Sequence, residues 1–251
     1  MPEMTPQLFM VLLTTGLLPG ALIGSVGVGG VLLAPLLAIL VGFDLHAAMA
    51  TSSFSFIFTG VIGTIEYARR GSVDWRSAAW LAGPVVPAAI LGARVNSLLT
   101  TGGLVLVLVA LLAWSGFRTL LAKDPAEPVR SRRLPRVLLL TIGAVAGFGS
   151  ALTGTGGPVM LLPMLLLFKL PALIAIGVSQ VVQVPIALFA SVGYSMHGDV
   201  HVLAGTLLGV SQAVGVLIGA RLAHALPRKL LSNAVAFTLL ILAAILLIGV
   251  R

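Results

Sequence analysis

The sequence contains no cysteine and very little charge. Of its 251 residues, only 9% are Asp, Glu, Lys or Arg, whereas 59% are hydrophobic, and the mean hydropathy is +1.14. The lack of cysteine excludes disulfides, thiolate metal sites and a cysteine nucleophile. A water-soluble domain is about one quarter charged, so the shortage of charge excludes a water-soluble fold. We therefore expect an all-α integral membrane protein whose surface faces lipid.

The few charges are mostly positive. Fifteen Lys and Arg against seven Asp and Glu give a net charge of +8. Such an excess can indicate a nucleic-acid-binding protein, but here the cations lie between apolar runs, where they set membrane orientation. We therefore expect the lipid bilayer, and no nucleic acid, as a partner of this protein. Residues 1–6 have no cationic side chain, unlike the start of a signal peptide, so we interpret the first apolar run as a retained helix.

The chain contains an internal duplication with an offset of 127 residues. LLTTG at 12–16 aligns with LLTIG at 139–143, GVGG at 27–30 with GTGG at 154–157, and Gly-Ala-Arg at 92–94 with the same tripeptide at 219–221. Of the 14 glycines between Leu12 and Leu112, seven align with glycine, where the overall content predicts about 1.6. We expect two membrane repeats, 1–117 and 137–251, joined by a basic linker, 118–136.

Each repeat contains five apolar segments. They are 7–24, 30–41, 46–67, 77–94 and 103–117 in the first repeat, and 137–149, 158–168, 172–195, 202–221 and 230–249 in the second. The second segment of each repeat is too short to span about 30 Å of hydrocarbon, because each helical residue adds only about 1.5 Å. Both short segments follow a glycine-rich turn, so we expect broken or re-entrant half-helices that begin near the bilayer midplane. The sequence leaves open whether 7–24 and 30–41 cross fully or form a re-entrant hairpin.

The distribution of cations predicts that the two repeats are inverted relative to each other. Arg69, Arg70 and Arg76 flank a loop whose aligned counterpart lacks Lys and Arg, and an odd number of segments per repeat reverses the second copy. The linker is expected on the cytoplasmic side, because cytoplasmic loops are rich in Lys and Arg. Its cations are Arg118, Lys123, Arg130, Arg132, Arg133 and Arg136.

The two glycine-rich turns are the main candidates for a binding site. The first N–H groups of a helix have no intrahelical acceptor, and the helix dipole places about half a positive charge there. Glycine lets a ligand approach these donors closely, so a small anion is the expected substrate. Two broken helices that meet at a repeat interface are a known transporter arrangement. Close helix packing is the alternative explanation of these glycines. The expected binding residues in the turns are Ser25, Gly27, Gly29, Gly30, Thr153, Gly154, Thr155, Gly156 and Gly157.

Uncharged polar side chains on two other segments are candidates to complete this site. Hydroxyl and amide groups can donate hydrogen bonds to an anion without carrying a permanent charge. Their alternative role is to hydrogen-bond a neighbouring helix or their own helix. They are Ser52 and Ser53 on the third segment, and Ser179, Gln180 and Gln183 on the eighth.

Three charged residues have candidate roles outside the turns. Arg94 and Arg221 end matched segments and are candidates for a vestibule or gate, the alternative being an anchor to lipid headgroups. Glu66 is a candidate for proton coupling, although an ion pair with Arg69 or Arg70 is the simpler expectation. The four histidines are scattered near segment ends, so no metal site and no cofactor are expected. No catalytic constellation lies at membrane depth, so we do not expect an enzyme.

The turn sequences GVGGVLLAP and GTGGPVMLLP, the repeated Gly-Ala-Arg and the expected all-helical chain of this length resemble the TauE/SafE family of sulfite and organosulfonate exporters. The resemblance covers nearly the whole chain. It implies a permease of a bacterial or archaeal inner membrane that exports small sulfur oxyanions such as sulfite or sulfoacetate. Only the glycine turns at 27–30 and 154–157 match the pattern of the family residue by residue.

The membrane potential favours export of an anion without a coupled ion. Each negative charge that leaves a cell with a negative interior gains about 2.3 kcal/mol per 100 mV. We therefore expect uniport, with at most a weak proton linkage through Glu66. The alternatives are a transporter of another small anion, a transporter of a metal cation, and a membrane scaffold without transport. The sequence leaves open which anion is carried and whether two protomers form a homodimer.

Overall fold

The computed structural model describes residues 6–98, 100–121, 134–168, 170–196 and 200–249, and every element within these ranges is a helix. The all-α fold expected from the sequence is confirmed, and each of the ten expected segments corresponds to a helix. The first half contains α1 (Pro6–Val26), the 3₁₀ helix η1 (Gly29–Leu32), α2 (Leu33–Val41), α3 (Leu45–Arg69), α4 (Trp75–Asn96) and α5 (Thr101–Leu121). The second half contains α6 (Arg136–Thr153), α7 (Pro158–Leu167), α8 (Ala172–Ser195), α9 (Val202–Ala225) and α10 (Arg228–Gly249).

Five helices in the described part of the chain are long and apolar enough to cross a membrane, namely α3, α4, α6, α8 and α9. Two helices are much shorter, with 9 residues in α2 and 10 in α7. At about 1.5 Å per residue, α7 is about 15 Å long, or about half of a hydrocarbon layer. The two short segments expected from the sequence are therefore present, each after a break that follows a long helix.

Side-chain caps explain two of the differences between the expected and the observed helix boundaries. Asp44 accepts a hydrogen bond from the backbone N–H of Ala47 at 3.0 Å, and Asp74 accepts from that of Arg76 at 3.2 Å. Such N-caps satisfy free N–H groups, so α3 and α4 begin slightly earlier than their apolar runs. Residues 118–121 and Arg136 of the expected linker, 118–136, are helical, since α5 ends at Leu121 and α6 begins at Arg136. Residues 122–133 of that linker lie outside the described residues.

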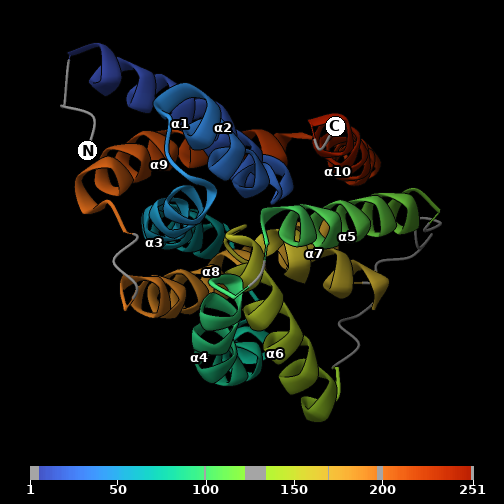
Figure 1. The fold of residues 1–251 in the computed structure, drawn as a ribbon. Coiled ribbons are helices and arrows are strands. Elements are labelled where there is room, and N and C mark those ends of the chain that lie inside the picture. Colours follow the sequence, from blue (N-terminus) through green and yellow to red (C-terminus); the bar gives the residue numbers. More distant parts are fainter. Residues whose placement is uncertain (1–5, 99, 122–133, 169, 197–199, 250–251) are drawn as a thin grey trace.

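Helices α3 and α8 lie in the middle of the molecule and pack against each other, with α1 and α9 on one side and α4 and α6 on another (Figure 1). The 127-residue offset exchanges these contacts for one another. The offset relates each helix of the first half to one of the second half, so the contact of α1 with α9 corresponds to that of α6 with α4, and the contact of α3 with α9 to that of α8 with α4. The contacts of α3 with α8 and of α5 with α10 each join two helices that the offset itself relates. The duplication in the sequence is therefore matched by a duplicated set of helix contacts.

Glycines at the helix contacts make the two halves pack in the same way. A Cβ atom on Gly219 of α9 would lie 2.1 Å from the carbonyl oxygen of Ala21 on α1. The aligned Gly92 of α4 would place a Cβ atom 2.2 Å from the carbonyl oxygen of Phe148 on α6. Both distances are far below a van der Waals contact, so only glycine permits these helices to approach so closely.

Two aligned tyrosines stabilise the points where α1 and α6 end. The hydroxyl of Tyr67 donates to the carbonyl oxygen of Gly24 at 2.7 Å, and that of Tyr194 donates to Ala151. Carbonyl groups in the last turn of a helix have no intrahelical partner, and leaving them unpaired away from water costs free energy. These hydroxyl groups therefore help both helices to stop inside a buried environment.

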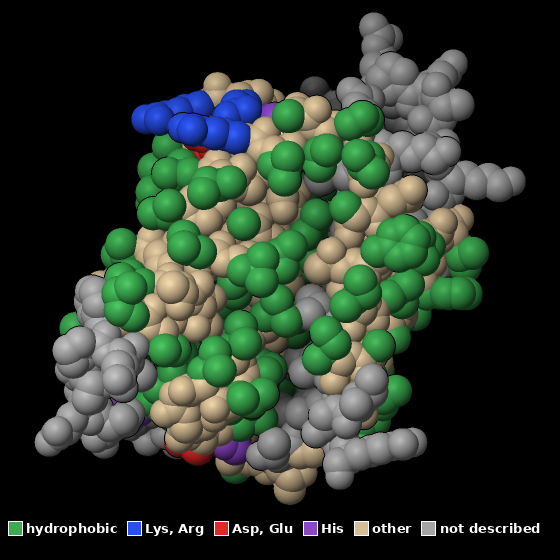
Figure 2. Space-filling view, turned by 90° about the horizontal axis from the view of Figure 1, so that it is seen from above, with side chains coloured by type: hydrophobic (Ala, Val, Ile, Leu, Met, Phe, Trp, Pro, Cys, Tyr) green, Lys and Arg blue, Asp and Glu red, His purple; other side chains and the backbone are tan. Residues whose placement is uncertain are grey.

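Charged side chains occupy only a small part of the molecular surface. In Figure 2, the Lys and Arg side chains in view gather at one end, and hydrophobic side chains cover much of the face between that end and the opposite one. Exposed apolar residues such as Leu188, Ile218 and Leu222 contribute to the described surface. An apolar surface of this kind is expected for helices that contact lipid.

Candidate functional site

The two long helices that precede the short ones both end at a glycine with a left-handed backbone. After α1, Gly27 has φ +76°, and after α6, the aligned Gly154 has φ +63°. A residue with a Cβ atom rarely adopts this conformation, which explains the glycine at each position. The expected interruptions at 27–30 and 154–157 are therefore present in the described chain.

The second turn, Gly154–Gly157, is more irregular than the first. Gly156 and Gly157 have φ +80° and +100°, and Pro158 follows as the first residue of α7. Proline suits this position because the N–H group that it lacks would have no helical acceptor.

The first turn, Gly27–Val28, is shorter than expected. Gly29 already belongs to η1, so the prediction that the short helix begins at residue 30 is wrong. Gly29 is needed for space, since a Cβ atom there would lie 2.0 Å from the carbonyl oxygen of Pro19. Glycine is therefore required at aligned positions of the two halves for different reasons, namely space at Gly29 and a positive φ at Gly156.

The second turn contacts the beginning of η1 in the interior. A Cβ atom on Gly30 would lie 2.5 Å from the carbonyl oxygen of Thr155, so η1 lies directly against the second turn. The residues of both turns are buried, and Thr155 is only 2% exposed. The beginnings of the two short helices are therefore close together and enclosed by protein.

Both short helices begin without a side-chain cap. In the second turn, the N–H of Thr155 donates to the carbonyl oxygen of Ser150 at 3.1 Å. The backbone hydrogen bonds of the described chain include none from the N–H groups of Gly156 and Gly157. Buried N–H groups are almost always paired in native structures, so these two are available to a ligand or a water molecule.

One face of α3 lies against the second turn. A Cβ atom on Gly154 would lie 2.6 Å from the Cβ of Met49, and one on Gly156 would lie 2.4 Å from the ring of Phe56. Ser52 and Ser53 lie between these residues at helical spacings of three and four, so they are on the same face. Ser52 is fully buried, and its hydroxyl has no hydrogen-bond partner in the described chain.

The ring of Phe56 lies against both η1 and the second turn. It is fully buried, and it lies within 3.0 Å of the Cβ position of Gly30 as well as against Gly156. The sequence does not single out this residue, because an apolar side chain on an apolar segment carries no signal of its own. The only available signal was its position, four residues after Ser52 and seven after Met49 on the helix face that carries the candidate serines.

Helix α8 contributes two amides that cross to the other half of the molecule. The Nε2 of Gln180 donates to the carbonyl oxygen of Ile23 near the end of α1, at 3.0 Å. The Nε2 of Gln183 donates to the carbonyl oxygen of Phe56 at 3.1 Å and to the hydroxyl of Thr59 at 2.5 Å. Both glutamines are fully buried, and they connect α8 to the first turn and to the Phe56 face of α3.

Most of the candidate hydroxyl groups hydrogen-bond locally. Ser25 donates to the carbonyl oxygen of Ala21 and Ser179 to that of Ala175, both at 2.7 Å. These bonds lie within a single helix and match the alternative role considered for serine. The hydroxyls of Thr153 and Thr155 lie 3.0 Å apart, and that of Thr153 also donates to the carbonyl oxygen of Gly149.

The charged candidates lie apart from the turns. Arg94 and Arg221 are exposed, and a guanidinium nitrogen of Arg94 lies 3.7 Å from the sulfur of Met196. Glu66 forms an ion pair with Arg70, in which Oε1 lies 2.7 Å from Nη2. The structure thus groups the turns, Ser52 and the glutamines but does not bring the arginines or the glutamate to them.

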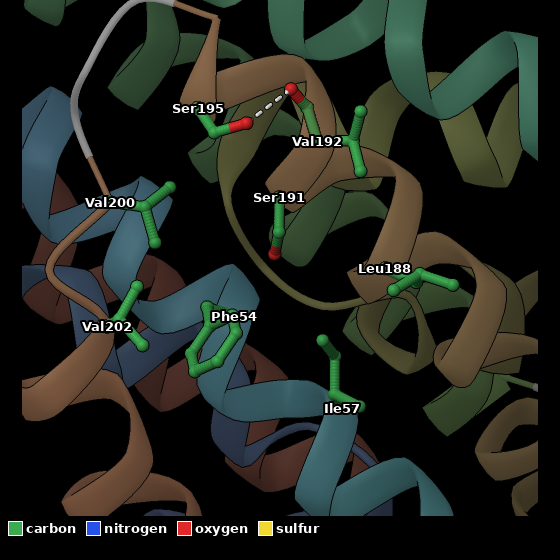
Figure 3. Close-up of a pocket in the computed structure, with 8 residues that line it drawn as sticks. All are labelled: Phe54, Ile57, Leu188, Ser191, Val192, Ser195, Val200 and Val202. Carbon is green, nitrogen blue, oxygen red and sulfur yellow. Dashed lines mark hydrogen bonds between the residues drawn. The ribbon is translucent and has the colours of Figure 1, made fainter.

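A groove elsewhere on the molecule does not have the chemistry of an anion site. It has a volume of about 310 Å³ and lies between α3, α8 and the beginning of α9 (Figure 3). Six of its eight lining side chains are apolar, and the hydroxyls of Ser191 and Ser195 donate to carbonyl groups of their own helix. Leu188 and Val192 of its lining are exposed on the apolar surface, so the groove suits hydrocarbon rather than an anion.

The fold and the buried turns define a polytopic α-helical membrane protein with a polar centre enclosed by apolar helices. The model of the sulfite exporter TauE/SafE family matches residues 12–246, which is nearly the whole chain. The chain therefore belongs to the TauE/SafE family and is a membrane transporter.

The curated relatives of this chain are also described as probable membrane transporters. A probable membrane transporter protein of Xylella fastidiosa (strain 9a5c) is 30% identical over 200 residues, or 77% of each chain. The probable membrane transporter proteins YdhB and YunE of Bacillus subtilis are 24% and 26% identical, and the alignments cover 91% and 96% of this chain and 96% of each relative. No solved structure matches the chain.

Proposed function

We propose that this transporter exports small sulfur-containing oxyanions, such as sulfite or sulfoacetate, across a bacterial or archaeal inner membrane. The anion binds between the two glycine turns, next to Ser52 and Gln183. The observation that carries this proposal is the contact between the two uncapped helix beginnings, with the unpaired N–H groups of Gly156 and Gly157. Helix N-termini of this kind bind oxyanions through N–H donors and the helix dipole.

We further propose that the two repeats have inverted topology. The exchange of helix contacts by the 127-residue offset supports a twofold relation between the halves. Under this relation the two short helices approach the bilayer midplane from opposite sides, and the turns meet there. A substrate held at that depth can be released to either side by alternate movements of the two halves.

The proposed orientation places the basic end of the molecule in the cytoplasm. Arg69, Arg70 and Arg76 are exposed near the connection between α3 and α4, and the linker 118–136 supplies six further cations. The gathering of Lys and Arg at one end in Figure 2 supports this assignment. A negative potential on that side then favours the exit of an anion by about 2.3 kcal/mol per charge at 100 mV.

Uniport follows from the lack of a titratable partner at the turns. The residues that line them on α3 and α8 are uncharged, and Glu66 is held in an ion pair with Arg70. We therefore propose that the membrane potential alone drives export, and that Glu66 has a structural role.

Transport also requires the Phe56 ring to move. In the described state this ring lies against both η1 and the second turn, so the site is closed. A rotation of this side chain, coupled to a shift of α3 against α8, would let an anion reach the N–H groups of the second turn.

The proposal is tested by sulfite efflux from liposomes that contain the purified protein and carry an imposed membrane potential. Ala in place of Gly156 requires a positive φ, which costs about 1–2 kcal/mol, and its Cβ displaces the Phe56 ring. We expect the Gly156→Ala variant to fold but to lose efflux. Gly83→Ala is the matched control, since a Cβ there meets nothing within 4 Å.

The outcomes separate the proposed function from its alternatives. Absence of efflux of sulfite and of organosulfonates from wild-type vesicles would contradict the exporter. A Gly156→Ala variant with altered stability but unchanged binding of sulfite would instead indicate a scaffold. Efflux that requires an imposed proton gradient and ignores the membrane potential would contradict uniport.

A further inference from the structure

The charge that the turn site can balance is small. The residues of the two turns and of the facing sides of α3 and α8 carry no ionisable side chain. The two helix beginnings each supply about half a positive charge, so together they compensate about one negative charge. A dianion would keep about one uncompensated charge in a buried environment, which is strongly unfavourable.

The orientation of the Gln183 amide is fixed by its neighbours. Its nitrogen faces the carbonyl oxygen of Phe56, which can only accept a hydrogen bond. The amide oxygen consequently points away from that carbonyl, and it has no partner in the described chain although the side chain is fully buried. A Cβ atom on Gly157 would lie 3.5 Å from the Cα of Gln183, so this residue lies beside the beginning of α7.

The amide oxygens of Gln180 and Gln212 also lack a hydrogen-bond partner in the described chain, but they lie in other surroundings. The oxygen of Gln180 is covered by Gly63 of α3, whose Cβ position lies 2.5 Å away. Gln212 lies at the contact between α9 and α3, where its nitrogen donates to the hydroxyl of Ser55. Gln183 alone among these three lies against a turn glycine, and an unpaired buried acceptor there is costly until a donor arrives.

We propose that, among these sulfur oxyanions, the site prefers a singly charged one that also carries a hydrogen-bond donor over a dianion such as sulfoacetate, and that Gln183 is the residue that accepts this hydrogen bond. This inference rests on the proposed anion site between the turns. Hydrogen sulfite meets both requirements, because it has one negative charge and one proton. The N–H groups of Gly156 and Gly157 bind its oxygens, and its proton is donated to the Oε1 of Gln183.

The test compares two anions of equal charge on the purified wild-type protein. Hydrogen sulfite can donate a hydrogen bond through an O–H group, whereas methanesulfonate carries a methyl group on sulfur and has no proton to donate. Thermal stabilisation by each anion gives its dissociation constant. At mildly acidic pH we expect hydrogen sulfite to bind about tenfold more tightly or better, the usual effect of a hydrogen bond to a buried group. At mildly alkaline pH, sulfite becomes a dianion and should bind more weakly, while methanesulfonate should be unaffected.

A variant pair assigns the preference to one side chain. Gln183→Met has a similar shape but a poor acceptor, so it should bind the two anions with nearly equal affinity. Gln212→Met also replaces a buried glutamine and should keep the wild-type preference.

Each outcome decides between the two proposals. Equal binding of the two anions by the wild type, or a preference that survives in a folded Gln183→Met variant, overturns the role of Gln183 but leaves the anion site. Failure of both anions to stabilise the wild type overturns the anion site as well. If Gln183→Met does not fold, the wild-type comparison and its pH dependence decide the question.

Discussion

Removal of the Phe56 ring should open the buried site to water. The accessible fraction of this residue is 0%, and its ring lies between Gly30 and Gly156. Ser52, one helical turn before it, is equally buried. The natural chain has no cysteine, so a Ser52→Cys variant carries a single thiol that reports access to this site.

The expected size of the effect follows from burial. Replacing a buried phenylalanine with alanine costs about 3–5 kcal/mol, within a global stability of about 5–15 kcal/mol, so Phe56→Ala should lower the melting temperature yet still fold. Phe56→Leu keeps most of the volume and should cost about 1.5 kcal/mol or less. We expect the thiol at position 52 to react at least about tenfold faster when Phe56→Ala is also present, because a free-energy change of about 1.4 kcal/mol in favour of the open state already gives this factor.

The assay measures modification of the thiol by a membrane-impermeant anionic methanethiosulfonate, with mass spectrometry as the readout. Ser55→Cys is the matched buried control, because Ser55 hydrogen-bonds Gln212 at the contact with α9 and is fully buried. The thiol at position 55 should stay unreactive in both backgrounds. Equal reactivity at position 52 with and without the ring would refute the reasoning, and equal acceleration at position 55 would show general unfolding instead.

Two further variants test the packing and the coupling. Gly219→Ala places a Cβ atom 2.1 Å from the carbonyl oxygen of Ala21, so α1 and α9 must separate, and we expect a destabilisation of about 1–3 kcal/mol in thermal unfolding. Gly83→Ala should leave the unfolding midpoint nearly unchanged, and a similar loss in both variants would argue against the close contact. Glu66→Gln removes an ion pair with Arg70 that is worth about 1 kcal/mol or less. Potential-driven sulfite efflux should therefore continue, and its loss would restore a coupling role for Glu66.

The helix boundaries were largely predictable because strong local signals mark them. Gly27 and Gly154 end helices through a positive φ that other residues avoid, and Pro158 begins one. The need for glycine at position 29 was not predictable, because it comes from the close approach of Gly29 to the backbone of Pro19 on α1. Local conformation is encoded near the residue, whereas close approach depends on how distant segments pack.

The candidate site was predictable in its turns but less so in its side chains. Ser179 was paired with Ser52 by the alignment, yet Ser179 donates to its own helix while Ser52 has no partner in the described chain. Rotation about one side-chain bond decides whether a serine hydroxyl bonds its own helix, and the sequence does not predict that rotation. Phe56 was missed for a related reason, since composition does not distinguish a ring that fills a site from one that fills a core.

One aligned pair of residues with different chemistry meets at the centre of the molecule. The 127-residue offset places Phe56 on Gln183, and these two residues contact each other through the hydrogen bond from the Gln183 amide to the Phe56 carbonyl. A site with identical halves would present either two rings or two amides. With one of each, the first half supplies the apolar group that closes the space and the second supplies the polar group that can bind a ligand there. The divergence of this one pair therefore places an apolar ring from the first half beside a polar amide from the second half at the proposed site.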